Sequence, residues 1–370
     1  MMSTLELPAK RSVLEVDPGE LGAWMAERGY PAYHARQVYR WIFERRGDRF
    51  EAMSDLPRRL REALETEWSV FSTTVALHHV SPDGTDKLLL ECPDGRRVEC
   101  VLMAEEARRT VCVSTQVGCG MGCVFCASGL KGVERNLTRG EIVEQVLRLR
   151  NLLPLGERLT NLVVMGMGES LANLDNLIPA LDRICSPEGL GMGQRRVTIS
   201  TVGLPEKMRK LAAMDRQYHL AVSLHAPTEV LRNKLVPING KVGLRAVVDA
   251  ADHYFRSSGR QVTFEYVLLK GINDGESEAK ALADLLEAKK AHANLIPYNP
   301  VAGLPYERPK AESIRRFEAI LRGRGVSVSV RKTKGREIDA ACGQLRRRSE
   351  PSPSVARLQE VGSAAVPLPS

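Results

Sequence analysis

Long hydrophobic runs and aromatic residues are scarce in this chain of 370 residues, of which 5% are Phe, Trp or Tyr. No run of about 18 apolar residues is present, which argues against an ordinary membrane-spanning helix. The N-terminus also lacks the charged and then apolar order that is typical of a signal peptide. We therefore expect a cytoplasmic protein that does not contact the membrane.

Cysteine is scarce, with eight residues, all between positions 92 and 342 of the chain. In a cytosolic protein such cysteines are more often metal ligands, nucleophiles or buried thiols than parts of a disulfide framework. The composition, 43% hydrophobic and 26% charged, excludes a collagen-like, coiled-coil or wholly disordered chain. A formal net charge of +8 is compatible with a polyanionic partner but indicates little on its own.

The order of patterns along the chain predicts four regions. Residues 1–72 have helical periodicity and predict a small N-terminal domain, while residues 73–104 predict a β-hairpin extension with two Pro-Asp-Gly turns. Residues 105–345 alternate between strand and helix patterns six times, which predicts a parallel α/β sheet, open or closed into part of a barrel. Residues 346–370 are rich in Ser, Pro, Ala and Arg, and predict a disordered tail.

Within the α/β region, Thr138 and Glu141 have the spacing of a capping box and predict a helix that begins there. The carboxyl ends of the strands are where such folds place their chemistry. The predicted strands are 111–115, 162–165, 197–200, 219–224, 262–268 and 294–297.

The sharpest feature is a C-x3-C-x2-C motif formed by Cys119, Cys123 and Cys126, directly after the first of these strands. Three thiolates within eight residues can hold one corner of an iron–sulfur cluster. A [4Fe–4S] cube takes four ligands, so three cysteines leave one iron open to an exogenous ligand. The alternatives are a zinc site, which would normally bring a second Cys or His pair, and buried thiols without a ligand.

Further stretches accompany this motif in a fixed order along the chain, and together they are far more specific than any one of them. They are CVSTQVGC at 112–119, GMGE at 166–169, STVG at 200–203, SLH at 223–225, PYNP at 297–300 and ACGQL at 341–345. From about residue 30 to 345 the pattern resembles the RlmN/Cfr family of radical S-adenosylmethionine (SAM) RNA adenine methyltransferases. The resemblance implies a partial (βα)6 radical-SAM barrel with a small N-terminal helical domain and a β extension.

The same resemblance implies the cofactors and three catalytic residues. One [4Fe–4S] cluster per chain binds SAM at its open iron, and two SAM molecules are consumed per methyl transfer. Cys342 matches the cysteine that the first SAM molecule methylates. A radical made from the second SAM molecule then activates this methyl group. Cys112 matches the resolving cysteine, which forms a transient disulfide with Cys342. Glu99 matches the proton acceptor that removes a hydrogen from the adenine ring.

The residues that match SAM contacts lie at predicted strand ends. Gly168 allows close approach to the methionine amino group, and the Glu169 carboxylate can accept a hydrogen bond from it. The chain departs from the family at Ser170, where proline is usual; proline stiffens a turn, and we expect activity to survive its absence. The other matching positions are Ser200, Ser223, Leu224, His225 and Asn299. The cysteines interpreted as structural are Cys92, Cys100 and Cys185.

The resemblance implies RNA as the partner. The methylated atoms would be C2 of a peptidyl-transferase-centre adenine in 23S rRNA and C2 of an adenine in tRNA. It also implies a reducing electron donor such as flavodoxin, and we expect a monomer. The alternative within the family is methylation of C8 of the same rRNA adenine. Two further alternatives are a radical SAM enzyme acting on a protein or small molecule, and an iron–sulfur RNA-binding module without turnover. Cys342 argues against both, because neither needs a methylatable cysteine.

The N-terminal helices carry arginines beside Tyr39 and Trp41, which we interpret as a platform for RNA. The alternative is a solvated basic face over an ordinary aromatic core. These arginines are Arg36, Arg40, Arg45, Arg46, Arg58, Arg59 and Arg61.

Overall fold

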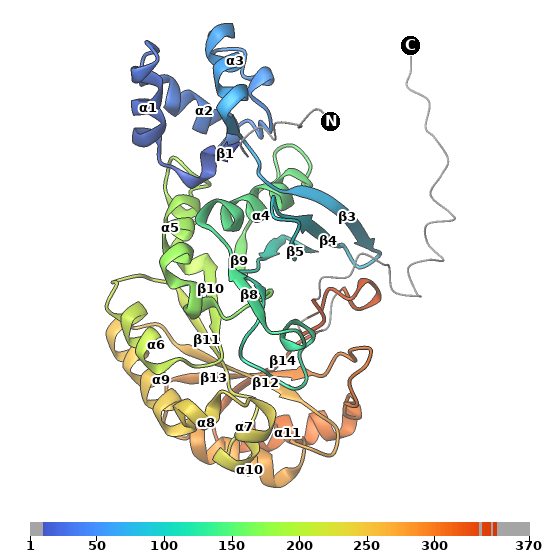
Figure 1. Ribbon diagram of the computed structural model, residues 1–370. Helices are drawn as coiled ribbons and strands as arrows, with labels where there is room; N and C mark the ends of the chain where they lie inside the picture. Colours follow the sequence, from blue (N-terminus) through green and yellow to red (C-terminus); the bar gives the residue numbers. More distant parts are fainter. Residues whose placement is uncertain (1–9, 333–334, 342, 346–370) are drawn as a thin grey trace, which may run out of the picture.

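The computed structural model describes residues 10–332, 335–341 and 343–345 (Figure 1). The tail predicted to be disordered, 346–370, and the catalytic candidate Cys342 lie outside these residues. Within them, no helix is both long and apolar enough to cross a membrane.

Three short α-helices and a pair of two-residue strands form the N-terminal part, at the top of Figure 1. Val38 and Ile42 are fully buried in its core and Trp41 is half-buried, so the predicted helical face is confirmed. Strands β1 and β2 pair in parallel and tie the start of this part to its end. The elements are β1 (Arg11–Ser12), α1 (Pro18–Glu27), α2 (His34–Phe43), α3 (Arg58–Glu67) and β2 (Trp68–Ser69), with 3-10 turns at Val13–Glu15 and Phe50–Ala52.

A ten-stranded sheet forms the rest of the molecule, in the order β14-β13-β12-β11-β10-β9-β6-β5-β4-β3. The antiparallel extension consists of β3 (Thr74–Ser81), β4 (Thr85–Glu91) and β5 (Arg97–Glu105). The parallel strands are β6 (Arg108–Cys112), β9 (Asn161–Val164), β10 (Val197–Thr201), β11 (His219–Ser223), β12 (Val262–Leu268), β13 (Ala291–Pro297) and β14 (Ser327–Val330). A separate two-stranded sheet pairs β7 (Gln116–Gly118) with β8 (Val133–Asn136).

The six predicted strand–helix units are confirmed, and β14 adds a parallel strand that the sequence analysis did not predict. Strand β6 begins at Arg108, three residues before the predicted start at Val111, because it also pairs antiparallel with β5. The same strand then pairs in parallel with β9. Through β6, the extension and the barrel therefore form one continuous sheet.

Amphipathic helices cover the outer side of the parallel sheet (Figure 1). The predicted capping box is present, since the Thr138 hydroxyl accepts from the Glu141 amide and the Glu141 carboxylate accepts from the Thr138 amide. The helices are α4 (Arg139–Asn151), α5 (Leu174–Cys185), α6 (Pro205–Ala212), α7 (Glu229–Leu235), α8 (Asn239–Val242), α9 (Leu244–Ser258), α10 (Glu276–Leu286) and α11 (Ala311–Gly323). The 3-10 turns of this part are Ala127–Gly129, Ser170–Asn173, Gln194–Arg196 and Arg336–Ile338.

Glu144 on α4 fastens the segment that joins the N-terminal part to the sheet. Its fully buried carboxylate accepts from the amide and hydroxyl of Ser72 at 2.8 and 2.9 Å. The amide and hydroxyl of Thr73 donate to it at 3.0 and 2.5 Å. The Arg148 guanidinium lies 2.8 Å away and balances the charge. Because each partner of this group is satisfied, the joint is rigid.

We predict that Glu144→Ala destabilises the protein by about 3 kcal/mol, because it leaves buried amides and a buried arginine without their acceptor. The thermal midpoint, followed by far-UV circular dichroism, should fall by several degrees. The control is Glu62→Ala, which removes an exposed ion pair on α3 and should leave the midpoint unchanged. An unchanged midpoint for Glu144→Ala would contradict the role of this joint.

Candidate functional site

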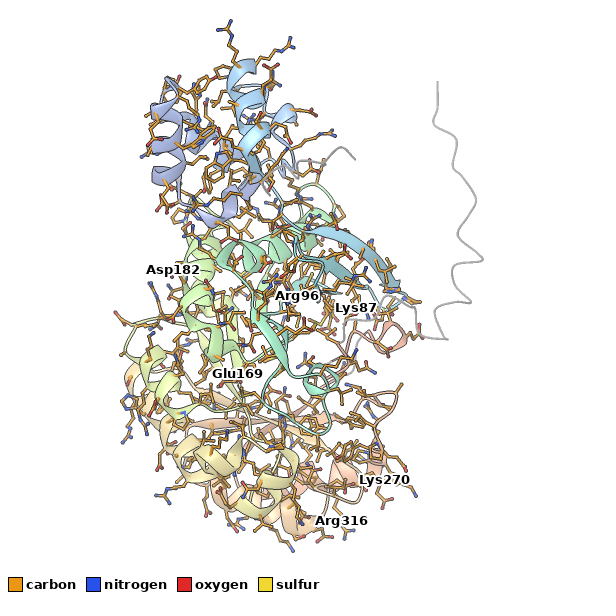
Figure 2. The ribbon with its side chains drawn as sticks, in the orientation of Figure 1. Lys87, Arg96, Glu169, Asp182, Lys270 and Arg316 are labelled. Atoms are coloured by element: carbon orange, nitrogen blue, oxygen red, sulfur yellow. The ribbon has the colours of Figure 1, made fainter. Side chains whose placement is uncertain are left out.

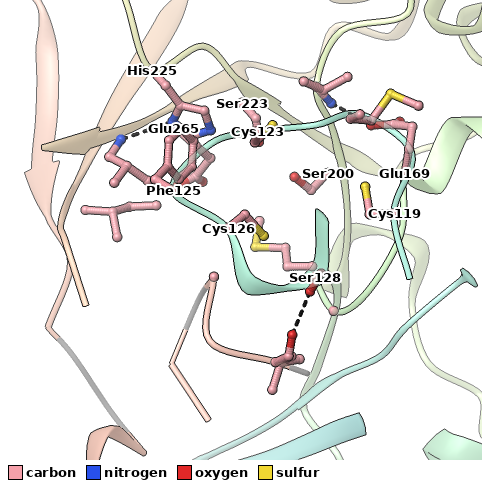
Figure 3. Close-up of a pocket in the computed structure, with 18 of the residues that line it drawn as sticks. Cys119, Cys123, Phe125, Cys126, Ser128, Glu169, Ser200, Ser223, His225 and Glu265 are labelled. Carbon is pink, nitrogen blue, oxygen red and sulfur yellow. Dashed lines mark hydrogen bonds between the residues drawn. The ribbon is translucent and has the colours of Figure 1, made fainter. Parts of the chain in front are cut away.

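A cavity lies between the carboxyl ends of the parallel strands and the loop that follows β7 (Figure 3). Residues far apart in the sequence gather around it, as the position of chemistry in parallel α/β folds predicts. The predicted site residues that line it are Cys119, Cys123, Cys126, Gly168, Glu169, Ser200, Ser223, His225 and Asn299.

The loop with the three cysteines turns tightly, so that all three face this cavity (Figure 3). Gly118, directly before the loop, has a φ of +80°. A Cβ atom there would lie 2.1 Å from the carbonyl oxygen of Gly132, so only glycine fits. The pairing of β7 with β8 holds the base of the loop. The backbone therefore fixes where the cysteines point.

The half-buried cysteines of this loop are costly to ionise on their own. Burial raises the pKa of Cys119 to about 12 and raises the pKa of Cys123 further, and the neighbouring thiols add to both shifts. Arg232 acts in the opposite direction on Cys123. A coordinated metal stabilises thiolates, because a coordinating thiol is deprotonated. The three side chains therefore fit a bound iron–sulfur cluster.

An iron–sulfur cluster and a single zinc ion require different spacings of cysteine ligands. Among the described residues, no three Cys, His, Asp or Glu side chains lie close enough together to hold one metal ion. Zinc would draw each thiolate to about 2.3 Å from one centre. The cysteines of an iron–sulfur cube instead attach to separate irons and stand further apart.

Backbone amides fix the Glu169 carboxylate in the cavity wall. The amide of Leu171 donates to it at 3.0 Å and that of Val202 at 2.7 Å. Burial raises the pKa of Glu169, and these hydrogen bonds oppose the shift. A carboxylate has about four lone-pair sites, so Glu169 keeps capacity to accept from an ammonium group in the cavity.

Gly168 and Ser170 set the turn on either side of Glu169. Gly168 has a φ of +105°, and a Cβ there would meet the Gln116 side chain at 2.6 Å, so the position requires glycine. The Ser170 hydroxyl donates to the carbonyl of Val164 at 3.2 Å. This bond ties the turn to the end of β9, so the serine restrains the turn in a different way from the family's proline.

His225 is held as a neutral ring. Its Nδ1 accepts from the Val267 amide at 3.1 Å, which leaves the ring proton on Nε2 as a donor. Burial, with a smaller effect of Arg232, lowers the pKa of His225 to about 3. The ring of Phe125 packs edge-on against it at 4.9 Å between centroids. Its backbone has a φ of +60°, uncommon outside glycine.

Leu224 differs from the other predicted SAM-binding residues in that it is fully buried and does not line the cavity. Its amide donates to the Glu265 carbonyl at 2.9 Å. Leu224 thus stands behind the wall that Ser223 and His225 form. Its predicted contact with SAM stays a prediction, as do the contacts assigned to the other residues.

Arg232 on α7 supports the cavity, and the sequence analysis did not single it out. Its fully buried guanidinium donates to the carbonyl oxygens of Val202, Ser223 and Leu224 and so joins the ends of β10 and β11. Burial lowers its pKa to about 10. A sequence signal existed, since Arg232 falls on the same helical face as the buried Leu235, three residues further on.

Cys112 and Glu99 lie apart from the first cavity. A second cavity adjoins it, with Glu265 and Asn299 bordering both, and Cys112 lines this second cavity. Glu99 is buried on β5, where its carboxylate lies 2.9 Å from the ammonium of Lys87. The predicted proton acceptor and resolving cysteine therefore do not line the first cavity, although Asn299, a predicted SAM-binding residue, borders the cavity that Cys112 lines.

The segment around Cys342 docks on the cysteine loop, although Cys342 itself lies outside the described residues. The amide of Ala127 donates to the Gly343 carbonyl at 2.8 Å, and the Ser128 hydroxyl donates to the Leu345 carbonyl at 2.9 Å (Figure 3). Gly343 and Leu345 also line the first cavity. These bonds hold the residues after position 342 directly behind the last cysteine of the loop.

The predicted RNA platform is wrong for Tyr39. This residue is 2% exposed, and its hydroxyl donates to the carbonyl oxygens of Val13 and Val16, so it belongs to the core of the N-terminal part. Trp41 is half-buried, with the Arg45 guanidinium stacked 4.6 Å from its ring centroid. The exposed arginines include Arg36, Arg40 and Arg59.

Comparisons with known proteins match both parts of the chain. A model of the radical SAM superfamily matches residues 113–284, and a model of the ribosomal RNA large subunit methyltransferase N-terminal domain matches residues 12–70. A probable dual-specificity RNA methyltransferase RlmN of Rhodopirellula baltica is 54% identical over 340 residues, covering 92% of each chain. Its counterpart in Bacillus subtilis is 41% identical over 343 residues, covering 92% of this chain and 94% of that one.

The chain belongs to the RlmN family.

A solved structure similar to this RlmN-family chain is that of a radical SAM methyltransferase from Sphaerobacter thermophilus. It has a TM-score of 0.89 and 42% sequence identity, covering 91% of this chain and 100% of that one. The resemblance and the fold class predicted from the motifs are thereby confirmed. As a member of the radical SAM superfamily, the chain uses a [4Fe–4S] cluster and SAM.

We predict that His225 makes the protein less stable in acid. Its pKa is about 3 when folded and about 6.5 when unfolded, so between these values only the unfolded chain binds the proton. Stability therefore rises with pH through this window and levels off above it. From pH 7 to about 5.5, the wild type should lose about 1 kcal/mol more than His225→Gln, measured by urea denaturation. Equal losses would show that the ring accepts a proton in the folded state.

Proposed function

We propose that this chain methylates C2 of adenine in 23S rRNA and in tRNA, through a methyl group carried on Cys342. The observation that carries the proposal is the docking of residues 343–345 on the cysteine loop. It holds the segment bearing the methyl-carrying cysteine against the cavity predicted to bind the cluster and SAM. RNA as the class of substrate follows from membership of the RlmN family, whose relatives carry the name dual-specificity RNA methyltransferase.

The chain's own residues bind and orient the reactants. Cys119, Cys123 and Cys126 would hold the cluster, and Glu169 and His225 offer an acceptor and a donor to SAM in the same cavity. Bound together, these two cofactors supply the methyl group and a 5'-deoxyadenosyl radical. Such chemistry is required because C2 of adenine carries no lone pair with which to attack a sulfonium ion.

Glu99 and Cys112 complete the transfer after the Cys342 methylene has joined the ring. The Glu99 carboxylate would take the proton from C2, and the unpaired electron left by the radical addition would pass to a bound cluster, so that the ring becomes aromatic again. The Cys112 thiolate then attacks the Cys342 sulfur, so that an S–S bond forms and the S–C bond breaks. The pair of electrons from the broken bond stays on carbon, which takes up a proton and becomes the methyl group. An external dithiol returns the disulfide to two thiols.

The exposed arginines of the N-terminal part would bind the RNA phosphates. The target adenine would leave its stack in the RNA to reach the barrel. We further propose that the protein acts as a monomer in the cytoplasm, where its RNA substrates are found. A flavodoxin-like protein would supply the electrons.

The test is anaerobic turnover with isotopically labelled SAM and RNA transcripts, followed by mass spectrometry of the nucleosides. The wild type should label C2 of adenine, Cys342→Ala should label nothing, and Cys112→Ala should accumulate a covalent protein–RNA adduct. Cys185→Ala is the matched control, because this half-buried cysteine lies at the end of α5 and lines neither cavity. Label at C8, or SAM cleavage without labelled RNA, would overturn the proposal.

A further inference from the structure

One face of the antiparallel extension continues the inner face of the barrel. Lys87 on β4 lies opposite Val101 on β5, and Val101 lies opposite Cys112 on β6. Residues directly opposite each other in a ladder project to the same side, and so do residues two apart on one strand. Lys87, Glu99 and Cys112 therefore share one face, and it is the face that borders the second cavity.

Lys87 and Glu99 form an ion pair inside the protein. The ammonium nitrogen lies 2.9 Å from the carboxylate, and the two residues are 6% and 3% exposed. Removing two charges from water costs several kcal/mol for each ion, so such a pair adds little to stability compared with an apolar pair. What the pair does provide is a positive charge directly beside a buried carboxylate, and such a neighbour favours the ionised form of a carboxylate.

The same ammonium also binds the C-terminal segment. It donates to the carbonyl oxygen of Asp339 at 3.3 Å, three residues before Cys342. Nearby, the amide of Gly335 donates to the Asp83 carboxylate at 2.7 Å. A Cβ at Gly335 would lie 2.9 Å from the Thr85 side chain, so the segment packs closely on the β3–β4 hairpin. Lys87, labelled in Figure 2, lies where the extension meets this segment.

We propose that Lys87 is a positioning residue for methyl transfer. Its ammonium keeps Glu99 ionised, and it fastens the loop before Cys342 through the Asp339 carbonyl. One side chain on β4 thereby holds both the proton acceptor on β5 and the segment that leads to the methyl carrier. This inference rests on the proposed function, because it takes from it the roles of Glu99 and Cys342.

Other ionisable groups face the pair and enter any pH profile. His79 on β3 lies directly opposite Lys87, and burial together with this lysine lowers its pKa, so it stays neutral above pH 7. Burial raises the pKa of Cys100, beside Glu99, well above its usual value. Cys112 and Asp339 complete the set. Lys87→Met removes one cause of the low pKa of His79, but burial, the larger cause, remains, so His79 stays neutral between pH 7 and 9 in every variant and differences between the profiles report on Lys87 and Glu99.

The experiment measures how fast the protein–RNA adduct is resolved in a single turnover, as a function of pH, in the wild type and Lys87→Met. Without the ammonium, Glu99 loses an adjacent positive charge that favours its ionised form, while burial still favours the protonated form. Lys87→Met should therefore resolve the adduct at least tenfold more slowly at pH 7, and the deficit should shrink as the pH approaches 9. Lys87→Arg should recover most of the rate. With RNA deuterated at adenine C2, the isotope effect should be larger in Lys87→Met than in the wild type.

Lys270→Met is the control, because it removes a lysine from an exposed lysine–glutamate pair. Wild-type rates and a wild-type pH profile in Lys87→Met would overturn the inference, and so would a Glu99→Gln variant that resolves the adduct normally. Absence of labelled adenine in the wild type would instead overturn the proposed function. If Lys87→Met folds poorly, Lys87→Met/Glu99→Gln should regain stability, since no buried charge is left unpaired. A double variant no more stable than the single one would also overturn the inference.

Discussion

The ionisation of the half-buried thiols in the loop after β7 is the constraint on which this molecule depends. The loop from Cys119 to Cys126 places them at the carboxyl ends of the parallel strands, where burial raises the pKa of Cys119 and Cys123. The buried Arg232 opposes this only in part, and its guanidinium is already committed to three strand-end carbonyls. Thiolates become stable at this place when they are bound to a metal cluster. The cavity around them also holds a hydrogen-bond acceptor, Glu169, and a neutral donor, His225, which are predicted to contact SAM.

The second organising feature is the continuity of the sheet from the barrel into the extension. Strand β6 pairs in parallel on one side and antiparallel on the other, which brings the inner faces of both parts together. Residues of the extension thereby reach the C-terminal segment from one side, while the cysteine loop binds it from the other. The segment that bears Cys342 is thus clamped between the part predicted to make the radical and the part predicted to remove the ring proton.

Local patterns were sufficient to predict much of this from the sequence. The cysteine motif, the six strand–helix units and the capping box at Thr138 each depend on residues close together in the chain. The ion pair of Lys87 with Glu99 could not be predicted, because it depends on the register between two strands. Tyr39 looked like an RNA contact because it is an aromatic residue among arginines, but the partners that bury its hydroxyl come from another segment. Strand β14 has only four residues and becomes a strand by pairing with β13.

Mössbauer spectroscopy of protein purified without oxygen, with and without added SAM, tests the central claim most directly. The account predicts a cubane cluster with three irons ligated by cysteine, and a change confined to the fourth iron when SAM binds. Tetrahedral zinc in place of iron, or a cluster in which SAM alters no iron, would contradict it.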